Sequence, residues 1–404
     1  MSTPLNKLCE LIVDCPHSTA PDEGEGYPLI RTPNIGPGYL DLADVHRVSK
    51  ETYDIRNARA VPQPMDLILA REAPAGNVGI IRDGQWVCLG QRTVLIRLDQ
   101  SKVDPWFLNY YLNAPRQRHR LLSNANGATV SHVNMPIIRN LPVDMPSMAA
   151  QRRIASILMA YDNLIENNRS QIALLEEAAQ RLYREWFVDL RFPGHGNVEI
   201  VDGLPAGWLS MPVSEYAHVV KGCSYKTENI DVEQGVPMVN LASIASWGGY
   251  KPYTERVYGG AYKAEQVLSA NDVVMALTEQ TAGLAGYVAR IPRYAKGSIP
   301  SMDLACLRPK SGTRAYLYCA CRYGDVSRLL SPLANGTKIK HLKPEALGYT
   351  DMPVPPMELQ QRFEDAVSPM FGGIDVLMEQ SECLRAARDC LLPKLMSGEI
   401  KVEG

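Results

Sequence analysis

The sequence has no apolar run that approaches the roughly 18 residues needed to span a bilayer. Its first residues, MSTPLNKLCELIVD, lack the basic start and the apolar stretch of a secretory signal peptide. The nine cysteines include no CxxC pair, and Cys319 and Cys321 are too close for the usual zinc spacing. We therefore expect a cytoplasmic protein with reduced structural thiols and no membrane partner.

Several catalytic motifs are also missing. No GxxxxGK followed by Ser or Thr is present, which excludes a P-loop motor. A methyltransferase would need a glycine-rich cofactor loop and an Asn/Asp-Pro-Pro-aromatic motif, and neither occurs. Glu399 and Lys401 form an ExK without a matching nuclease strand, and the seven histidines show no metal-ligand spacing. We expect no catalytic residue, metal or cofactor in this chain, which is therefore predicted not to be an enzyme.

Charge of one sign is not in large excess. The formal net charge of −2 argues against a protein that coats nucleic acid nonspecifically, although it does not exclude DNA binding. The only local excess of positive charge lies in residues 206–356, which contain 16 basic and 12 acidic residues. This excess is compatible with a nucleic-acid contact in that part of the chain.

The sequence does contain an internal repeat. The stretch ANGATVSHVNMP…DMPSMAAQRR aligns without a gap with ANGTKIKHLKPE…PVPPMELQQR, so that His132 pairs with His341 and Gln151 with Gln360. Self-similarity at a fixed offset indicates a duplicated structural unit. We predict two variable globular units, each followed by a more similar helical segment, with boundaries at 1–146, 147–205, 206–356 and 357–404.

The helical segments carry a coiled-coil pattern. From Ile154 to Trp186 apolar residues alternate at steps of four and three, with one polar member at Asn168, and the same offset carries this pattern into the second segment. We expect the two helices to pair with each other in antiparallel orientation; the alternative is a coiled coil between chains. The predicted seam comprises Ile154, Leu158, Ile165, Ile172, Leu175, Leu182, Phe363, Val367, Ile374, Leu377, Leu384 and Leu391. Pro369 and Gly372-Gly373 predict a kink or a break in the second helix.

The globular units combine short strands, polar loops and one amphipathic helix each. Strand-loop-strand patterns begin at Leu67 and Val273, and helical patterns begin at Trp106 and Arg314. The fold class that follows is mixed, α+β (α/β), with two tandem globular domains separated by long helices.

Candidate DNA contacts are basic and polar residues in the predicted loops. Lys and Arg bind phosphates, whereas Arg, Asn, Gln and Ser/Thr recognise base edges. The alternative interpretations are a solvated surface for the basic runs and a hydrogen-bonded turn for His132 and His341. The candidates are Arg71, Arg92, Arg116, Arg118, Arg120, Ser131, His132, Thr278, Gln280, Thr337, Lys338, Lys340, His341 and Lys343.

The repeated motifs resemble those of the specificity subunits of type I restriction-modification systems. The resemblance rests on ANGATVSHV…DMPSMAAQRRIASIL and ANGTKIKHLK…PVPPMELQQRF, on YREWFVDLRFPG and on the closing LLPKLMSGEI. It covers essentially the whole chain, and two copies in this order are specific.

The resemblance implies a noncatalytic DNA-recognition subunit with two target recognition domains, each recognising one half of a split, asymmetric site in double-stranded DNA. It implies two modification (methyltransferase) subunits as partners, together with restriction subunits that translocate and cleave DNA. The cofactors S-adenosylmethionine, ATP and magnesium would belong to those partners. Two other functions stay open: a protein-binding scaffold with tandem domains, and an enzyme of unrecognised type, which the missing motifs disfavour.

Overall fold

Two short apolar strands, β5 (Leu67–Ala70) and β16 (Val273–Ala276), are buried along their whole length. Alternate side chains of a strand point to opposite faces of the sheet, so both strands belong to sheets that are covered on both sides. The computed structural model describes residues 2–43, 45–123, 132–201, 203–251, 256–279 and 282–402.

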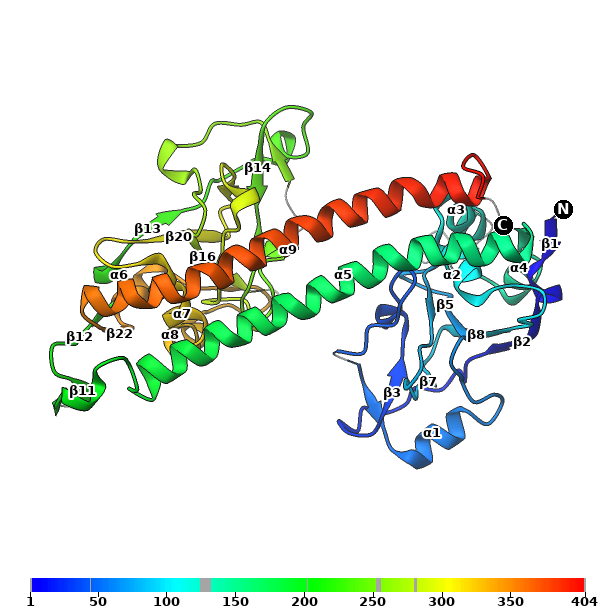
Figure 1. The fold of residues 1–404 in the computed structure, drawn as a ribbon, viewed down its shortest axis with the longest axis horizontal. Coiled ribbons are helices and arrows are strands. Elements are labelled where there is room, and N and C mark those ends of the chain that lie inside the picture. Colours follow the sequence, from blue (N-terminus) through cyan, green and yellow to red (C-terminus); the bar gives the residue numbers. More distant parts are fainter. Residues whose placement is uncertain are drawn as a thin grey trace. The chain divides into compact units, whose positions relative to one another are not determined.

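The chain divides into two compact units. Unit 1 comprises Met1–Ile165 and Cys383–Gly404, and unit 2 comprises Glu166–Glu382. The helices α5 (Met148–Tyr183) and α9 (Met357–Ser397) each contribute one part to each unit. A π-helical turn, Arg184–Val188, follows α5. Figure 1 shows the elements in their chain order.

Unit 1 contains an antiparallel four-stranded sheet in the order β2-β8-β5-β6 and a three-stranded sheet in the order β4-β3-β7, in which β3 and β7 are parallel. A small ladder joins β1 to β9. The strands are β1 (Ser2–Pro4), β2 (Cys9–Asp14), β3 (Tyr27–Ile30), β4 (Arg47–Val48), β6 (Val78–Ile80), β7 (Cys88–Leu89), β8 (Thr93–Leu98) and β9 (Pro142–Asp144).

Unit 2 repeats this topology. Its four-stranded sheet has the order β13-β20-β16-β18, and its three-stranded sheet has the order β15-β14-β19 with β14 and β19 parallel. Two-stranded ladders join β12 to β22, β10 to β11 and β17 to β21. The strands are β10 (Ile200–Val201), β11 (Leu204–Pro205), β12 (Leu209–Pro212), β13 (Ala217–Lys221), β14 (Val236–Val239), β15 (Arg256–Tyr258), β17 (Thr278–Glu279), β18 (Val288–Arg290), β19 (Ile299–Pro300), β20 (Leu304–Pro309), β21 (Lys340–His341) and β22 (Asp351–Val354).

Each four-stranded sheet separates two hydrophobic cores. In unit 1, Leu67 and Leu69 face the core that contains α2, whereas Ile68 faces a second core on the other side. In unit 2, Val273 and Val274 divide in the same way between two cores. The shorter helices are α1 (Lys50–Arg56), α2 (Pro105–Asn113), α3 (Pro115–Ser123), α4 (Met135–Arg139), α6 (Val213–Tyr216), α7 (Arg314–Arg322) and α8 (Val326–Leu330).

The two long helices pair in antiparallel orientation within each unit. In unit 1, Arg388 of α9 forms an ion pair with Asp162 of α5 at 2.5 Å. In unit 2, the Asn168 side-chain amide donates to Ser381 Oγ at 3.3 Å. The partner of Asn168 on α9 therefore precedes the partner of Asp162 in the sequence, as antiparallel packing requires. The expected mixed fold with two long helices is confirmed.

Of the kink or break expected in the second helix at Pro369 and Gly372-Gly373, the break is wrong, because α9 is a single helix from Met357 to Ser397. Pro369 is exposed, so its ring projects into solvent. A Cβ on Gly373 would lie 3.2 Å from Leu175 Cδ1, so glycine allows the close approach of α5 at this point. The glycine therefore serves helix packing and does not end the helix.

The predicted seam residues are all buried or partly buried. Several of them pack on the globular parts as well as on the opposite helix: Leu158 belongs to the core of unit 1, and Val367 belongs to the main core of unit 2. At the end of α5 the Phe187 ring lies 4.9 Å from the ring of Phe363 in an edge-on contact. The seam thus anchors each globular part to the helices.

Candidate nucleic-acid interface

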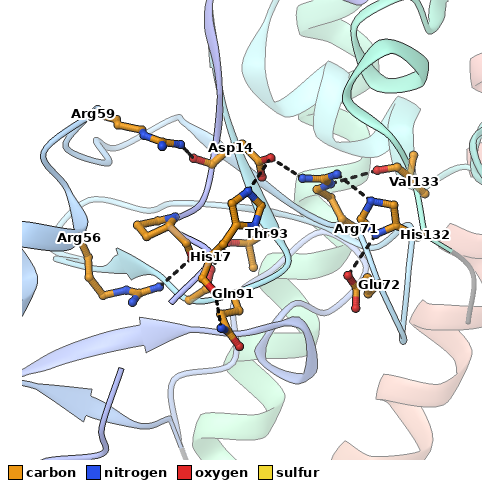
Figure 2. A network of polar contacts seen from close by, with 12 residues as sticks. Asp14, His17, Arg56, Arg59, Arg71, Glu72, Gln91, Thr93, His132 and Val133 are labelled. Carbon is orange, nitrogen blue, oxygen red and sulfur yellow. Dashed lines mark hydrogen bonds and ion pairs between the residues drawn. The ribbon is translucent and has the colours of Figure 1, made fainter. Parts of the chain in front are cut away.

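A polar network in unit 1 joins the end of β5 to the chain that follows the first repeat loop. The Arg71 guanidinium donates to Asp14 Oδ2 at 2.5 Å, to the Val133 carbonyl at 3.0 Å and to His132 Nε2 at 2.8 Å. Figure 2 shows this guanidinium between the Asp14 carboxylate and the His132 ring. Asp14 ends β2 and Arg71 follows β5, so the sheet brings together residues that are far apart in the sequence.

These contacts assign the state of the His132 ring. A guanidinium only donates, so His132 Nε2 must accept the hydrogen bond from Arg71. The ring proton then lies on Nδ1, which is 3.1 Å from Glu72 Oε1. Glu72 also binds Arg92 Nε at 2.8 Å through its other oxygen. The two contacts therefore fix the orientation of the His132 ring between Arg71 and Glu72.

The candidates in this network differ in their access to solvent. The Arg71 side chain is only 8% exposed, so it positions its neighbours. The Arg92 side chain is 60% exposed, and His132 is 36% exposed. Arg92 has a positive φ of 67°, which places it in a turn at the start of β8. Of these three predicted candidates, Arg92 is the one best able to contact a ligand.

Unit 2 has a corresponding group of residues at the end of β16. The Thr278 hydroxyl donates to Asp303 Oδ1 at 2.8 Å and lies 3.4 Å from His341 Nδ1. Thr278 is buried, and His341, which β21 places opposite it, is exposed. The histidine that follows each repeat loop therefore lies beside a residue just after the equivalent buried strand, β5 in unit 1 and β16 in unit 2.

A carboxylate holds one of the predicted basic residues next to this group. Lys340 Nζ binds Glu279 Oε1 at 3.0 Å. Burial alone would raise the pKa of Glu279, but hydrogen bonds from Lys340 and from the Leu284 and Ala285 amides outweigh it and lower the pKa below its usual value. Glu279 is therefore a carboxylate at neutral pH, and it fixes the direction of Lys340.

The sheet registers show which positions are equivalent. Ala70 of β5 pairs with Thr93, and Ala276 of β16 pairs with Leu304. Glu72 and Thr278 follow the last paired residues of β5 and β16 by two positions. Arg92 and Asp303 precede the first paired residues of β8 and β20 by one position. Glu72 and Arg92 of unit 1 are therefore equivalent to Thr278 and Asp303 of unit 2.

Three further basic candidates lie on α3. Arg116 is exposed, whereas Arg118 and Arg120 are partly buried and reach the backbone carbonyls of Ala75 and Pro142 at 3.4 Å. Gly76 faces the aliphatic part of Arg118, so α3 packs against the loop that follows β5.

The second basic cluster is exposed as a whole. It comprises Thr337, Lys338, Lys340, His341 and Lys343. The predicted candidates Ser131 and Gln280 lie outside the described residues.

The sequence interpretation missed the acidic members of both groups. Asp14, Glu72, Glu279 and Asp303 are not among the predicted candidates, because side chains that bind phosphates or read base edges were expected to be basic or neutral. Glu72 and Glu279 follow the buried strands within three residues, and this position was the available signal. Asp14 and Asp303 become neighbours of these strands only through the sheet.

Neither a metal site nor a membrane-spanning helix is found within the described ranges. No group of three or more His, Cys, Asp or Glu side chains there could hold a metal ion. Among the helices that the structure describes, none is both long and apolar enough to cross a membrane.

Known proteins resemble this chain in sequence and in fold. Residues 7–177 match the family described as type I restriction modification DNA specificity domain. The MjaIX specificity subunit of Methanocaldococcus jannaschii is 24% identical over 83% of this chain and 78% of its own length. The MjaVIII specificity subunit of the same organism is 22% identical over 95% of this chain and 88% of its own.

Residues 7–177 thus carry the type I restriction modification DNA specificity domain, and the chain is similar along most of its length to type I specificity subunits. A solved specificity subunit, the type I S subunit from M. genitalium, has the same fold: it superposes with a TM-score of 0.55 at 16% identity, covering 98% of this chain and 95% of that one. The present chain therefore shares its fold with a protein of very different sequence.

Proposed function

We propose that this chain is a type I specificity subunit that recognises a bipartite, asymmetric site in double-stranded DNA, with each unit recognising one half. The observation that carries the proposal is the duplication: the two units have the same sheet orders but different side chains at the positions equivalent to Glu72 and Arg92. A duplicated fold with different side chains at equivalent positions suits two half-sites of different sequence. Two such units on one chain multiply their specificities.

The exposed basic residues supply the phosphate contacts in this proposal. Lys338 and Lys343 lie next to His341 and are exposed, and Arg116 lies on the exposed side of α3. Contacts of Lys and Arg with phosphates fix the position of a protein on DNA but carry no sequence information. Base recognition is assigned to polar side chains at the strand ends.

The long helices have two roles in the proposal. They set the number of unread base pairs between the half-sites, and they dock two modification subunits, which restriction subunits join. Leu164 and Leu174 of α5 are large apolar side chains that are 51% and 64% exposed, as a docking surface would require. S-adenosylmethionine, ATP and magnesium would be bound by the partner subunits and not by this chain, and the complex would act in the cytoplasm.

Salt-dependent DNA binding separates this proposal from the alternative of a protein-binding scaffold. The complex with a co-expressed modification subunit would be titrated with duplex DNA at several salt concentrations. The logarithm of the affinity should fall linearly with the logarithm of the salt concentration, and each lost phosphate contact should reduce the slope by about 0.9. Lys338→Gln and Lys343→Gln should reduce it, and Lys102→Gln, in unit 1 and paired with Asp99, should not.

A scaffold would give a different result. The complex would then assemble normally but show no salt-dependent affinity for duplex DNA. If all variants bound DNA with the same salt dependence, DNA recognition would stand, but the basic cluster would not contribute phosphate contacts.

A further inference from the structure

The equivalent positions Arg92 and Asp303 carry opposite charges. Arg92 precedes β8 in unit 1, and Asp303 precedes β20 in unit 2, each one residue before the strand. Each contacts the residue that follows the neighbouring buried strand by two positions, Glu72 in one unit and Thr278 in the other. The fold therefore presents a cation in unit 1 at the place where it presents an anion in unit 2.

Arg92 is held in a way that leaves its recognition edge available. Glu72 binds Arg92 Nε at 2.8 Å, and the side chain is 60% exposed. Within the part of the chain that the structure describes, no hydrogen-bond partner is found for Nη1 or Nη2. Two parallel N–H donors on a fixed guanidinium match the O6 and N7 acceptors of guanine in the major groove.

Asp303 is held in a comparable way. The Thr278 hydroxyl donates to Oδ1 at 2.8 Å, and no partner for Oδ2 is found among the described residues. Asp303 lines an open hollow of about 830 Å³, together with Tyr225, Ser246, Lys251 and Arg256. The Oδ2 atom can accept a hydrogen bond from an amino group, whereas its negative charge repels a carbonyl oxygen or a phosphate.

We propose that Arg92 and Asp303 are matched specificity-determining residues: Arg92 recognises a guanine in one half-site, and Asp303 recognises an exocyclic amino group, of cytosine or adenine, in the other. This inference rests on the proposed function. The contacts to Glu72 and Thr278 fix the direction of each recognising group. The inverted charge makes the two units unable to exchange half-sites at this base.

The test is the methylated motif of cells that co-express this subunit, or a variant, with its modification subunit. Arg92→Ala should relax one guanine position of one half-site and leave the other half-site and the spacer unchanged. Asp303→Asn keeps an acceptor for Thr278 but replaces the second oxygen with an amide donor. It should relax or change one position of the other half-site only. Lys102→Ala, beyond the opposite end of β8, is the matched control and should change nothing.

Binding measurements extend the test to variants that no longer methylate. The purified complexes would be titrated with duplexes that carry each base at each specified position. The wild-type preference for the assigned base should fall roughly 10- to 100-fold in the matching variant, while affinity for unrelated DNA stays the same. Arg92→Lys keeps the charge but loses the paired donors, so it should also lose the preference.

The outcomes separate the two levels of the argument. A wild-type subunit without any dependent split motif would overturn the proposed function itself. A wild-type motif that both variants leave unchanged, in sequence and in base preference, would overturn only the assignment of Arg92 and Asp303. A uniform loss of affinity without a change of preference would also overturn it, because it would make these residues phosphate contacts or structural groups.

Discussion

Gln151 near the start of α5 and Gln360 near the start of α9 make the same two hydrogen bonds, 209 residues apart in the chain. The Gln151 side chain accepts from the Asp104 amide, the N-cap of α2, at 2.9 Å and donates to the Pro146 carbonyl at 3.0 Å. The glutamine of the repeated Gln-Arg motif thus joins the long helix to the N-terminus of a helix in the globular part. We call this pair of hydrogen bonds the latch.

The second copy of the latch carries one more contact. Gln360 accepts from the Thr313 amide, the N-cap of α7, at 3.2 Å and donates to the Pro355 carbonyl at 2.8 Å. It also accepts from the Tyr216 hydroxyl at 2.6 Å. Gln151 and Gln360 are 1% and 2% exposed.

Replacing either glutamine should destabilise its unit. Gln151→Ala removes two partly buried hydrogen bonds, which contribute about 0.5–1.5 kcal/mol each. Gln360→Ala should cost more, because its hydrogen bonds are buried and include that from the Tyr216 hydroxyl. Denaturant unfolding measures both. Gln171→Ala, at an exposed position of α5, is the control. Unfolding midpoints equal to that of the control would show that the latch does not hold the unit together.

A buried ion pair joins the sheet of unit 2 to α9. Arg290 Nη2 binds Asp375 Oδ1 at 2.6 Å, and the two side chains are 7% and 8% exposed. Asp375→Ala should lower the free energy of unfolding by about 3–5 kcal/mol, because it leaves an unpaired buried guanidinium.

The double variant tests the origin of that loss. Arg290→Met with Asp375→Leu should recover most of the stability, since no charge is then buried. Glu177→Ala, which breaks an exposed pair with Arg181, should have little effect. A double variant that is as unstable as the single one would mean that packing, and not the unpaired charge, determines the loss.

The nine cysteines should fall into reactive and protected classes. Cys383 and Cys390 on α9 are exposed, whereas burial raises the pKa of Cys88, Cys306 and Cys321 to about 12. A thiol with so high a pKa has almost no thiolate at pH 8, and the thiolate is the reactive form.

A thiol titration at pH 8 should therefore find two fast equivalents in the native protein and nine after denaturation. Binding of the modification subunits should slow these two if the helices are the docking surface. Cys383→Ser and Cys390→Ser would each remove one fast equivalent. Fast modification that persists in the double variant would contradict the assignment.

The length of the helices should set the spacing of the half-sites. Insertion of seven residues after Ile165 and seven after Glu382 adds one heptad to each helix and keeps the seam in phase. The added length of roughly 10 Å should lengthen the unread spacer by about three base pairs.

The methylated motif measures this spacer directly. A seven-residue insertion after the exposed Gly196, outside both helices, should leave it unchanged. If the variant with insertions in both α5 and α9 kept the wild-type spacer, the helices would not set the distance between the half-sites.

Much of the architecture was predictable from the sequence because helix periodicity is local. The four-three pattern from Ile154 onward identified the helices, and the offset of 209 identified the duplication. The break expected at Pro369 was wrong because a proline ring can face solvent within a helix that is held by packing on both sides of it.

The recognition groups were harder to predict because they depend on sheet register. The equivalence of Leu67 with Val273 has an offset of 206, and that of Thr93 with Leu304 has an offset of 211, so a constant offset of 209 misaligns both. Only the strand pairing shows that Arg92 corresponds to Asp303. The burial of Arg71 likewise follows from its contact with Asp14, 57 residues earlier.

The measurement that tests the central claim most directly is single-molecule sequencing of methylated adenines in the genome of the host, with this gene present and deleted. Recognition of a bipartite site by the two units predicts a split asymmetric motif that is methylated in the first strain and unmethylated in the second. Methylation that is indifferent to the deletion would contradict the claim.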